Sequence, residues 1–288
     1  NVQSTTGAFV GNFRWGPVEE RTLISNEAEL AETFGAPTDS DAEDFLSAAY
    51  FLRYSSSLQT VRMVDSDAAN ATDTTVGIQP VIKNLDNFDA QASALDSDGN
   101  VFIARYPGAV ANTLQISTCP VSTSDSAFDN WTYVNEFDAA PGTSDFASGV
   151  GASNDEMHVA VIDQDGLFSG TRGSVLETFP FVSLAKNAKN NDGSSNFIKD
   201  VINTRSNYIY MAGFGTGQFD SDAGTDAFLN VDFATANTDV RTNSFAGGVN
   251  SSNIGVDEYA NGFDYFEDKD TVTVDFLIAP GMLSRADQ

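Results

Sequence analysis

Clustered carboxylates are the side chains of this chain whose types and spacing best suit chemistry. Stretches rich in Asp lie at residues 96–99, 163–166 and 220–226, where acidic side chains stand close together. Hard cations such as Ca²⁺ bind clusters of oxygen ligands. None of the three stretches ends with the bidentate Glu of an EF-hand loop, and Asp-Gly and Asp-Ser pairs are ordinary turn chemistry. We interpret them as turns, and we expect no bound metal and no cofactor.

The remaining candidates for chemistry are weaker. His158 is the single histidine, and it lies in a predicted strand, with no Gly-x-Ser-x-Gly elbow elsewhere in the chain. The glycine run at 213–217 lacks the spacing of a phosphate loop and the Lys-Ser or Lys-Thr that follows one. Acidic pairs that could hydrolyse a glycoside are so numerous that no pair stands out. We therefore expect no catalytic residues and no enzymatic activity.

Charge excludes two classes of partner. The chain has 41 acidic and 14 basic residues, which gives a formal net charge of −27 at pH 7. A surface this negative repels phosphate backbones and anionic lipid headgroups. We expect neither nucleic acid nor a membrane among the partners.

Cys119 is the only cysteine, so no disulfide can form within the chain, and we expect it to be buried in or beside a strand.

The first 65 residues begin and end with a predicted strand. Residues 6–13 mix small and aromatic side chains as a buried strand does, and Gly16-Pro17 ends this segment. Apolar residues return at 60–64, after two helical segments. Two helices between two strands predict an α/β layer in which the strands pair in parallel.

Capping residues mark the two helices. Asn26 with Glu29 predicts the N-cap and capping box of the first helix, and Gly35 is a natural residue at its end. Ser40 with Glu43 predicts the N-cap of the second helix in the same way.

The rest of the chain is predicted to be rich in strands. Residues 66–100 are mostly Asp, Ala, Ser, Asn and Thr, and this shift marks the expected boundary or insertion point. Only residues 76–85 resemble a strand there. We therefore expect a mixed α/β and α+β fold, with an N-terminal α/β layer and an inserted strand-rich α+β domain. Later strands are expected at 101–105, 113–118, 157–162, 179–183, 208–211 and 271–278, a helix capped by Ser195 at 196–203, and polar loops at 213–224 and 245–255.

Four blocks of this sequence resemble the contractile tail sheath proteins of myovirus-type bacteriophages. In the first block, residues 14–17 (Arg-Trp-Gly-Pro) lead into a helix closed by Phe34-Gly35 and then into a strand at 58–64. The order of the blocks also matches, so the resemblance is collinear over nearly the whole chain. The later blocks are residues 104–112, 163–168, and 197–203 with 208–210.

The resemblance implies a structural subunit with a mechanical function. Many copies would stack as rings around a tail tube, and the sheath would shorten to drive the tube through a bacterial envelope. The implied partners are other sheath subunits, the tail tube protein, and the baseplate and tail terminator proteins. The implied location is the virion tail, assembled in the host bacterial cytoplasm. Tailocins and secretion-system sheaths share this architecture, and the sequence does not separate them from a phage.

The resemblance also implies a division of the chain. Residues 1–65 would be the first part of the sheath core domain, completed by residues 272–288 and by a further C-terminal region. Residues 66–271 would be the inserted domain. We expect the chain to be a fragment that cannot form a tube alone.

Five arginines are candidate subunit-interface residues. They are scarce cations in an acidic chain, and Arg makes bidentate, directional contacts with carboxylates. Solvated surface charges are the alternative interpretation for each of them. The candidates are Arg14, Arg21, Arg53, Arg62 and Arg105.

Two other functional classes remain open at this point. A secreted, acidic, strand-rich binding module, either an adhesin or a carbohydrate-binding domain, would fit the composition, the Asp turns and the glycosylation sequons at Asn70, Asn130 and Asn250. A cleavable signal upstream of Asn1 and a calcium-dependent melting temperature would favour this class. An acid hydrolase would need one essential pair of carboxylates, whereas a sheath subunit would need none.

Overall fold

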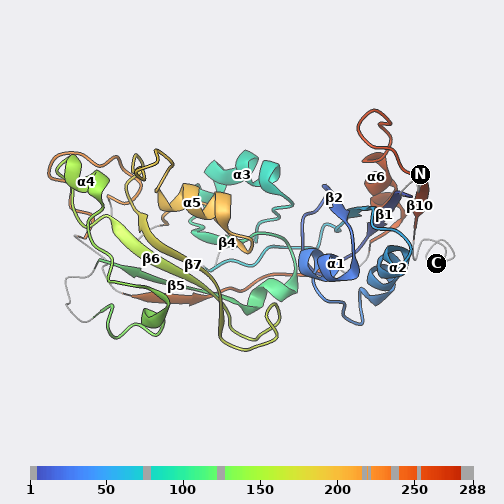
Figure 1. Ribbon diagram of the computed structural model, residues 1–288, viewed down its shortest axis with the longest axis horizontal. Coiled ribbons are helices and arrows are strands. Elements are labelled where there is room, and N and C mark those ends of the chain that lie inside the picture. The colour runs from blue at the N-terminus through green and yellow to red at the C-terminus, as the bar shows by residue number, and fades with distance from the viewer. Residues whose placement is uncertain are drawn as a thin grey trace.

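The computed structural model describes residues 5–73, 79–121, 127–215, 219, 222–234, 240–251 and 254–279. These residues form two parts of an elongated molecule (Figure 1). We call residues 5–65 and 254–279 the N-terminal layer, and residues 66–251 the strand-rich part. Each part combines helices with strands, so the expected mixed α/β and α+β fold class is confirmed.

The N-terminal layer is built on a four-stranded sheet. Strand β1 (Gly7–Gly11) lies between β3 (Leu58–Arg62) and β10 (Phe276–Ile278) and pairs in parallel with both. The expected parallel pairing of the first two predicted strands is therefore confirmed. Strand β2 (Arg21–Ile24) pairs antiparallel with β3 at the edge. The sequence analysis did not predict β2, because four residues are too few to reveal a two-residue period.

Helices cover both faces of this sheet. Successive side chains of a strand point to opposite faces. Phe9 packs with helices α1 (Glu27–Phe34) and α2 (Ala42–Leu52), whereas Ala8 and Val10 pack with helix α6 (Val256–Asp264). The alternation within β1 thus divides the layer into two small cores.

The helix caps are partly as predicted. Asn26 caps α1, since its side-chain oxygen accepts the N–H of Glu29 at 3.0 Å. The predicted N-cap of α2 is wrong by one residue, because that helix begins after Asp41 and not after Ser40. Asp41 makes no side-chain bond to the helix, and its carboxylate instead accepts the N–H of Thr38 at 2.6 Å.

The strand-rich part contains two sheets. Its larger sheet has the order β7-β6-β5-β9, with every pair antiparallel, and a two-stranded sheet pairs β4 with β8. The strands are β4 (Phe102–Ala104), β5 (Leu114–Pro120), β6 (Glu156–Asp163), β7 (Ser174–Ser183), β8 (Ile209–Met211) and β9 (Arg241–Ser244). The helices are α3 (Leu85–Ser97), α4 (Asp145–Gly149), α5 (Ile198–Arg205) and the short 3₁₀ helices η1 (Ala109–Thr113) and η2 (Val134–Glu136).

Most expected elements of this part are present, and one is wrong. The strands expected at 101–105, 113–118, 157–162, 179–183 and 208–211 and the helix expected at 196–203 are confirmed within a few residues. Residues 79–84 of the strand expected at 76–85 form no regular element, and α3 begins at Leu85; residues 76–78 lie outside the described residues. In the N-terminal layer, the final strand is shorter than the strand expected at 271–278, because β10 begins only at Phe276. In the described ranges, no helix has the length and apolarity needed to cross a bilayer.

Gly262 makes the closest contact between α6 and the sheet. A Cβ atom at this position would lie 2.4 Å from the Val10 Cγ1 atom and 3.0 Å from the Met63 Cγ atom. Both neighbours are buried, so they cannot move into solvent. Glycine at this position therefore sets the distance of α6 from β1.

We expect Gly262→Ala to lower the free energy of unfolding by about 1–3 kcal/mol, because the added methyl group overpacks the core. The matched control is Gly149→Ala at the end of α4, where a Cβ would meet no atom within 4 Å. That variant should stay within about 1 kcal/mol of the wild type. Chemical denaturation followed by circular dichroism measures both, and equal stabilities would contradict the packing argument.

Asp73 is a buried carboxylate that joins two sheets. It accepts the backbone N–H of Phe102 in β4 at 3.0 Å and the side-chain amide of Asn243 in β9 at 3.3 Å. Burial raises the pKa of Asp73 from 3.8 to about 6, although both hydrogen bonds act in the opposite direction.

This raised pKa predicts a pH dependence of stability. The folded state holds the Asp73 proton more tightly than the unfolded state, so the stability contributed by this group is fully present below pH 3.8 and is lost as pH rises to about 6. Relative to Asp73→Asn, which does not titrate, the wild type should lose up to roughly 3 kcal/mol between these pH values. Urea denaturation of both proteins across this range tests the idea, and a difference that does not vary with pH would refute it.

Candidate functional site

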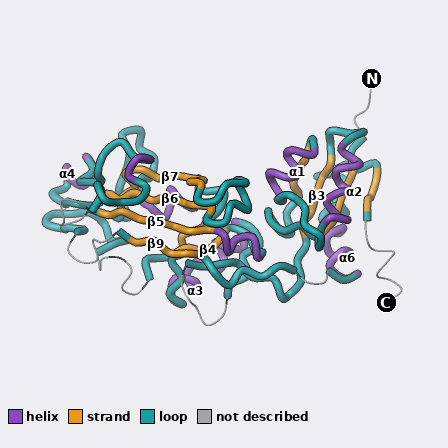
Figure 2. The backbone as a smooth tube through the Cα atoms, turned by 90° about the horizontal axis from the view of Figure 1, so that it is seen from below, coloured by secondary structure: helices purple, strands orange, loops and turns teal. Residues whose placement is uncertain are grey.

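The turn after β1 lies where the two parts of the molecule meet. Figure 2 shows the two parts beside each other, connected by loop segments. Residues from all four blocks that carry the sequence resemblance lie at this junction: the turn 14–17, residues 105–108, the loop 163–168 and Tyr208. The junction is therefore the candidate functional site.

The indole of Trp15 is buried at the centre of the junction. It makes edge-to-face contacts with Tyr106 and with Phe168, at centroid distances of 5.2 and 5.1 Å. Phe168 makes a third contact of this kind with Tyr208, at 5.2 Å. Aromatic pairs at such distances contribute about 0.5–1.5 kcal/mol each beyond burial. The rings thus connect the N-terminal layer to the strand-rich part.

Arg62, the last residue of β3, is the central polar group of the junction. Its side chain is 1% exposed, and it donates to the carbonyl oxygens of Phe13, Gly16 and Pro107 at 2.7, 2.8 and 2.7 Å. Burial lowers the pKa of Arg62 from 12.5 to about 9, although the charge of Asp41 acts in the opposite direction. The guanidinium is therefore still charged at pH 7, and it joins both parts through backbone oxygens.

Close approach of the backbone completes this contact. Gly108 has φ +149°, and a Cβ atom there would lie 2.5 Å from the carbonyl oxygen of Arg14. A side chain at position 108 would therefore push the two turns apart.

Arg14 makes a second connection across the junction. Its guanidinium donates to the carbonyl of Ala36 at 3.3 Å and to that of Leu167 at 3.1 Å. Burial lowers the pKa of Arg14, while the charges of Asp41 and Asp163 raise it.

Asp163 shapes the loop that Arg14 contacts. Burial raises the pKa of this carboxyl, but hydrogen bonds from Ser169, Thr113 and Phe168 outweigh burial, so that its pKa is lowered overall. The carboxylate also accepts the N–H groups of Gly166 and Leu167, both at 3.0 Å. Its oxygens are thus used by protein donors, which agrees with the turn interpretation of residues 163–166. Residues 220–221 of another Asp-rich stretch lie outside the described residues.

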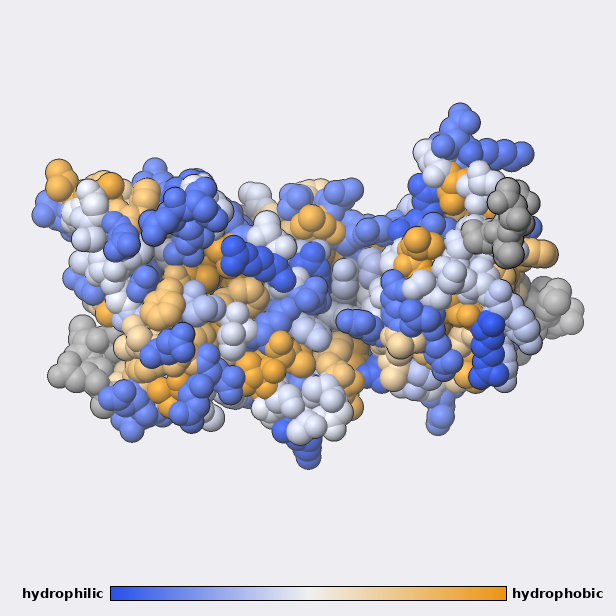
Figure 3. Space-filling view, in the orientation of Figure 1, coloured by the Kyte–Doolittle hydropathy of each residue, from blue (hydrophilic) through white to orange (hydrophobic). Residues whose placement is uncertain are grey.

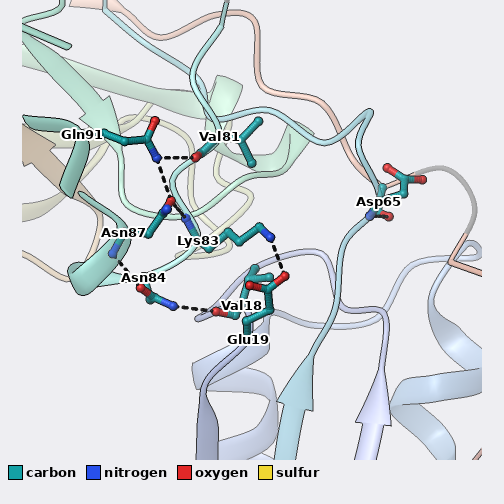
Figure 4. A network of polar contacts seen from close by, with 9 residues as sticks. Val18, Glu19, Asp65, Val81, Lys83, Asn84, Asn87 and Gln91 are labelled. Atoms are coloured by element: carbon teal, nitrogen blue, oxygen red, sulfur yellow. Dashed lines mark hydrogen bonds and ion pairs between the residues drawn. The ribbon is translucent and has the colours of Figure 1, made fainter. Parts of the chain in front are cut away.

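A third connection lies at the start of α3 (Figure 4). The backbone N–H of Val18 donates to the Lys83 carbonyl at 2.9 Å, and the side-chain amide of Asn84 donates to the Val18 carbonyl at 3.0 Å. Lys83 and Glu19 form an ion pair between half-exposed side chains. Asn84 also caps α3 by accepting the N–H of Asn87 at 2.9 Å. One segment therefore both starts a helix and contacts the N-terminal layer.

A groove of about 810 Å³ lies beside these connections. Its lining includes Glu29 and Glu32 of helix α1 and Arg14 and Arg105 of the junction turns. Leu167 also lines it. The molecule narrows between its two parts in the space-filling view (Figure 3).

Three of the candidate arginines lie at the junction. Arg62 is enclosed by its own chain, so it is not accessible to another subunit in this structure. Arg14 and Arg105 line the groove. Arg105 donates to the Ser206 carbonyl at 2.6 Å, and its guanidinium lies 4.5 Å from the centroid of the Tyr210 ring.

The other two candidates lie on the N-terminal layer. Arg21 donates to the hydroxyl of Thr271 at 3.3 Å. Arg53 is exposed at the end of α2, with its guanidinium 4.9 Å from the centroid of the Tyr50 ring. The structure thus does not bring the five arginines together in one site.

The residues considered for catalysis have structural partners. His158 is buried in β6; its Nε2 lies 2.7 Å from the Ala139 carbonyl, and its Nδ1 accepts the N–H of Phe181 at 3.0 Å. These contacts fit a neutral imidazole, and burial lowers the pKa of His158. Cys119 is buried in β5, as expected. In the ranges that the structure describes, no three His, Cys, Asp or Glu side chains gather in a group able to hold a metal ion.

Sequence reasoning missed several junction residues. The sequence analysis included Trp15 and Pro107 only as members of sequence blocks. No pattern in the sequence indicated which residues they contact. Lys83 and Asn84 were placed in a predicted strand. One signal could have revealed the cap of α3. Asn is a preferred N-cap residue, and Asn84 stands three residues before Asn87, whose N–H it accepts.

The three arginines of the junction thus bind backbone carbonyls of their own chain. No family model matches the chain. Tail sheath proteins of bacteriophages are similar to it in sequence. The chain is 36% identical over 172 residues to the tail sheath protein of Salmonella phage ViI, which covers 59% of this chain and 24% of that protein. It is 40% identical over 86 residues to that of Enterobacteria phage T4, covering 30% of this chain and 12% of that protein.

These alignments confirm the resemblance to phage tail sheath proteins. The chain spans about a quarter of the length of the ViI protein. Among solved structures, the sheath tail protein Lin1278 from Listeria innocua is similar with a TM-score of 0.48 at 11% identity, covering 100% of this chain and 43% of that one. The sheath tail protein DSY3957 from Desulfitobacterium hafniense is similar with a TM-score of 0.43 at 11% identity, covering 95% of this chain and 41% of that one.

We expect Arg62→Met to lower the free energy of unfolding by at least about 3 kcal/mol, because three buried carbonyls lose their donor. The control is Arg172→Met, which removes an exposed ion pair with Asp165 and should cost at most about 1 kcal/mol. Guanidinium chloride denaturation measures both. Similar losses in the two variants would show that the buried guanidinium is not the central group of the junction.

Proposed function

We propose that this chain is part of a structural subunit of a contractile phage tail sheath. Many copies of the subunit assemble around the tail tube, and the sheath shortens to drive the tube through the bacterial envelope. The observation that carries the proposal is the 36% identity over 172 residues to a tail sheath protein. Nothing in the comparisons supports a secreted binding module.

The proposal includes partners and a location. The partners are other sheath subunits, the tail tube protein, and the baseplate and tail terminator proteins. The subunit assembles in the host bacterial cytoplasm and resides in the virion tail. It needs no enzymatic activity and no cofactor, because contraction can be driven by subunit interfaces that have two discrete packings.

We also propose a division of the chain. Residues 1–65 belong to the sheath core domain, to which residues 272–288 return, and residues 66–271 form the inserted domain. The pairing of β10 with β1 supports such a return. The packing of α6 on β1 favours placing the return earlier, near Ile254.

The interface role proposed for the arginines differs from one residue to another. Arg53 and Arg21 are the members of the set on the surface of the N-terminal layer. Arg14 and Arg105 can act through the groove, and Arg62 acts only by holding the junction.

Electron microscopy of the complete subunit that contains this chain tests the proposed function. We expect striated hollow tubes or rings, formed alone or on added tail tube protein. The residues 1–288 expressed alone should give no tubes. Monodisperse particles of the complete subunit, even with tail tube present, would contradict the proposal.

A further inference from the structure

The outer face of helix α2 holds apolar side chains in water. Leu46 is 47% exposed, Tyr50 is 57% exposed, and Tyr54, just after the end of the helix, is 91% exposed. They follow one another at intervals of four residues, so they lie on one face of the helix. The opposite face of α2 is buried in the core of the N-terminal layer. Exposed apolar residues that adjoin one another mark interaction surfaces.

Two side chains of opposite charge flank the apolar residues on this face. Glu43 lies in the first turn of α2 and Arg53 lies at its C-cap, and both are exposed. The Arg53 guanidinium lies 4.9 Å from the centroid of the Tyr50 ring, so it follows the same face. Among the described residues, neither the Glu43 carboxylate nor this guanidinium has an ion-pair or hydrogen-bond partner. We call Glu43, Leu46, Tyr50 and Arg53 the α2 stripe.

The α2 stripe is complementary to a second copy of itself. Positions 43 and 53 are symmetric about position 48, and so are positions 46 and 50. If two α2 helices lie antiparallel about a two-fold axis at this level, Glu43 of each meets Arg53 of the other. Leu46 of each then meets Tyr50 of the other. The antiparallel arrangement also places the positive end of each helix dipole beside the negative end of its partner.

Other exposed apolar pairs do not have this complementarity. The residues at 228–229 and at 276–277 are at least as exposed as Tyr50. Their nearest charged neighbours in the sequence are Asp226 and Asp232 for the first pair and Asp275 for the second. Neither pair has an adjacent cation to face the carboxylates of a second copy, and like charges across a contact are unfavourable.

We propose that the α2 stripe binds the α2 stripe of a second copy of this chain, antiparallel and about a two-fold axis. Helix α2 lies in the part of the molecule remote from the strand-rich part, where a second copy can approach it (Figures 1 and 2). A two-fold contact closes at two copies, so it differs from contacts that build tubes. The proposal therefore does not depend on the sheath function.

The size and charge of the contact predict a weak dimer. A helix of 11 residues is about 16 Å long, and interfaces that bury less than about 1,200 Å² in total are weak and transient. The formal net charge of −27 on each copy also opposes association, although salt at about 0.15 M screens charges more than about 8 Å apart. We expect a dissociation constant on the order of 100 μM.

Sedimentation equilibrium of residues 1–288 in about 0.15 M salt tests the contact. The wild type should change from monomer to dimer as its concentration rises through about 100 μM. Glu43→Arg alone, or Arg53→Glu alone, places like charges at both ends of the contact and should weaken dimerisation at least about tenfold. The double variant Glu43→Arg/Arg53→Glu restores opposite charges and should recover the wild-type affinity to within about threefold.

Recovery in the double variant separates the contact from an effect on the helix itself. A cation at the start of α2 and an anion at its end both oppose the helix dipole, so helix destabilisation would be greatest in the double variant. The matched control is Glu27→Arg in the first turn of α1, which changes the net charge equally and should not weaken dimerisation.

Two results would overturn the proposal. One is a wild-type chain that stays monomeric up to about 1 mM. The other is a double variant that dimerises no better than the single variants. Neither result bears on the sheath function, which electron microscopy of the complete subunit tests separately.

Discussion

The structure depends on one buried cation. The guanidinium of Arg62 binds three carbonyl oxygens, which lie 49, 46 and 45 residues away in the sequence. Two of these oxygens belong to the turn after β1, and the third belongs to the strand-rich part. A lysine could not satisfy three acceptors in this planar arrangement. The strongly negative surface of the chain also favours a positive charge inside it, because the field of the acidic side chains extends into the protein.

Two further contacts join the N-terminal layer to the strand-rich part, and they lie away from Arg62. Arg14 holds the loop that Asp163 shapes, and the segment at Lys83 and Asn84 holds Val18, which lies between β1 and β2. Because the contacts are separated in space and differ in kind, rotation of either part about one of them would break the others. Several separate contacts therefore hold the two parts together.

Local patterns predicted much of the fold but little of the junction. The short apolar runs of β5, β6 and β7 and the cap at Asn26 depend on neighbouring residues, so the sequence reveals them. Helix α3 was missed because only Phe88 and Leu95 of its residues are buried, which is too few for a helical period. Arg62 was selected as an interface residue, but its actual partners are backbone oxygens, and no side-chain pattern indicates those. The cap of α2 was placed one residue early because Ser40 and Asp41 are both good caps.

The place of β1 within its sheet affects how the chain is made. Gly7 pairs with Phe276, so one edge of β1 stays open until the ribosome has reached residue 276. At about 5–20 residues per second, this interval lasts on the order of tens of seconds. An open strand edge is a template for pairing with another chain. The N-terminal layer must therefore be completed after synthesis of the strand-rich part, and crowded nascent chains could exchange β10 before each has closed its own sheet.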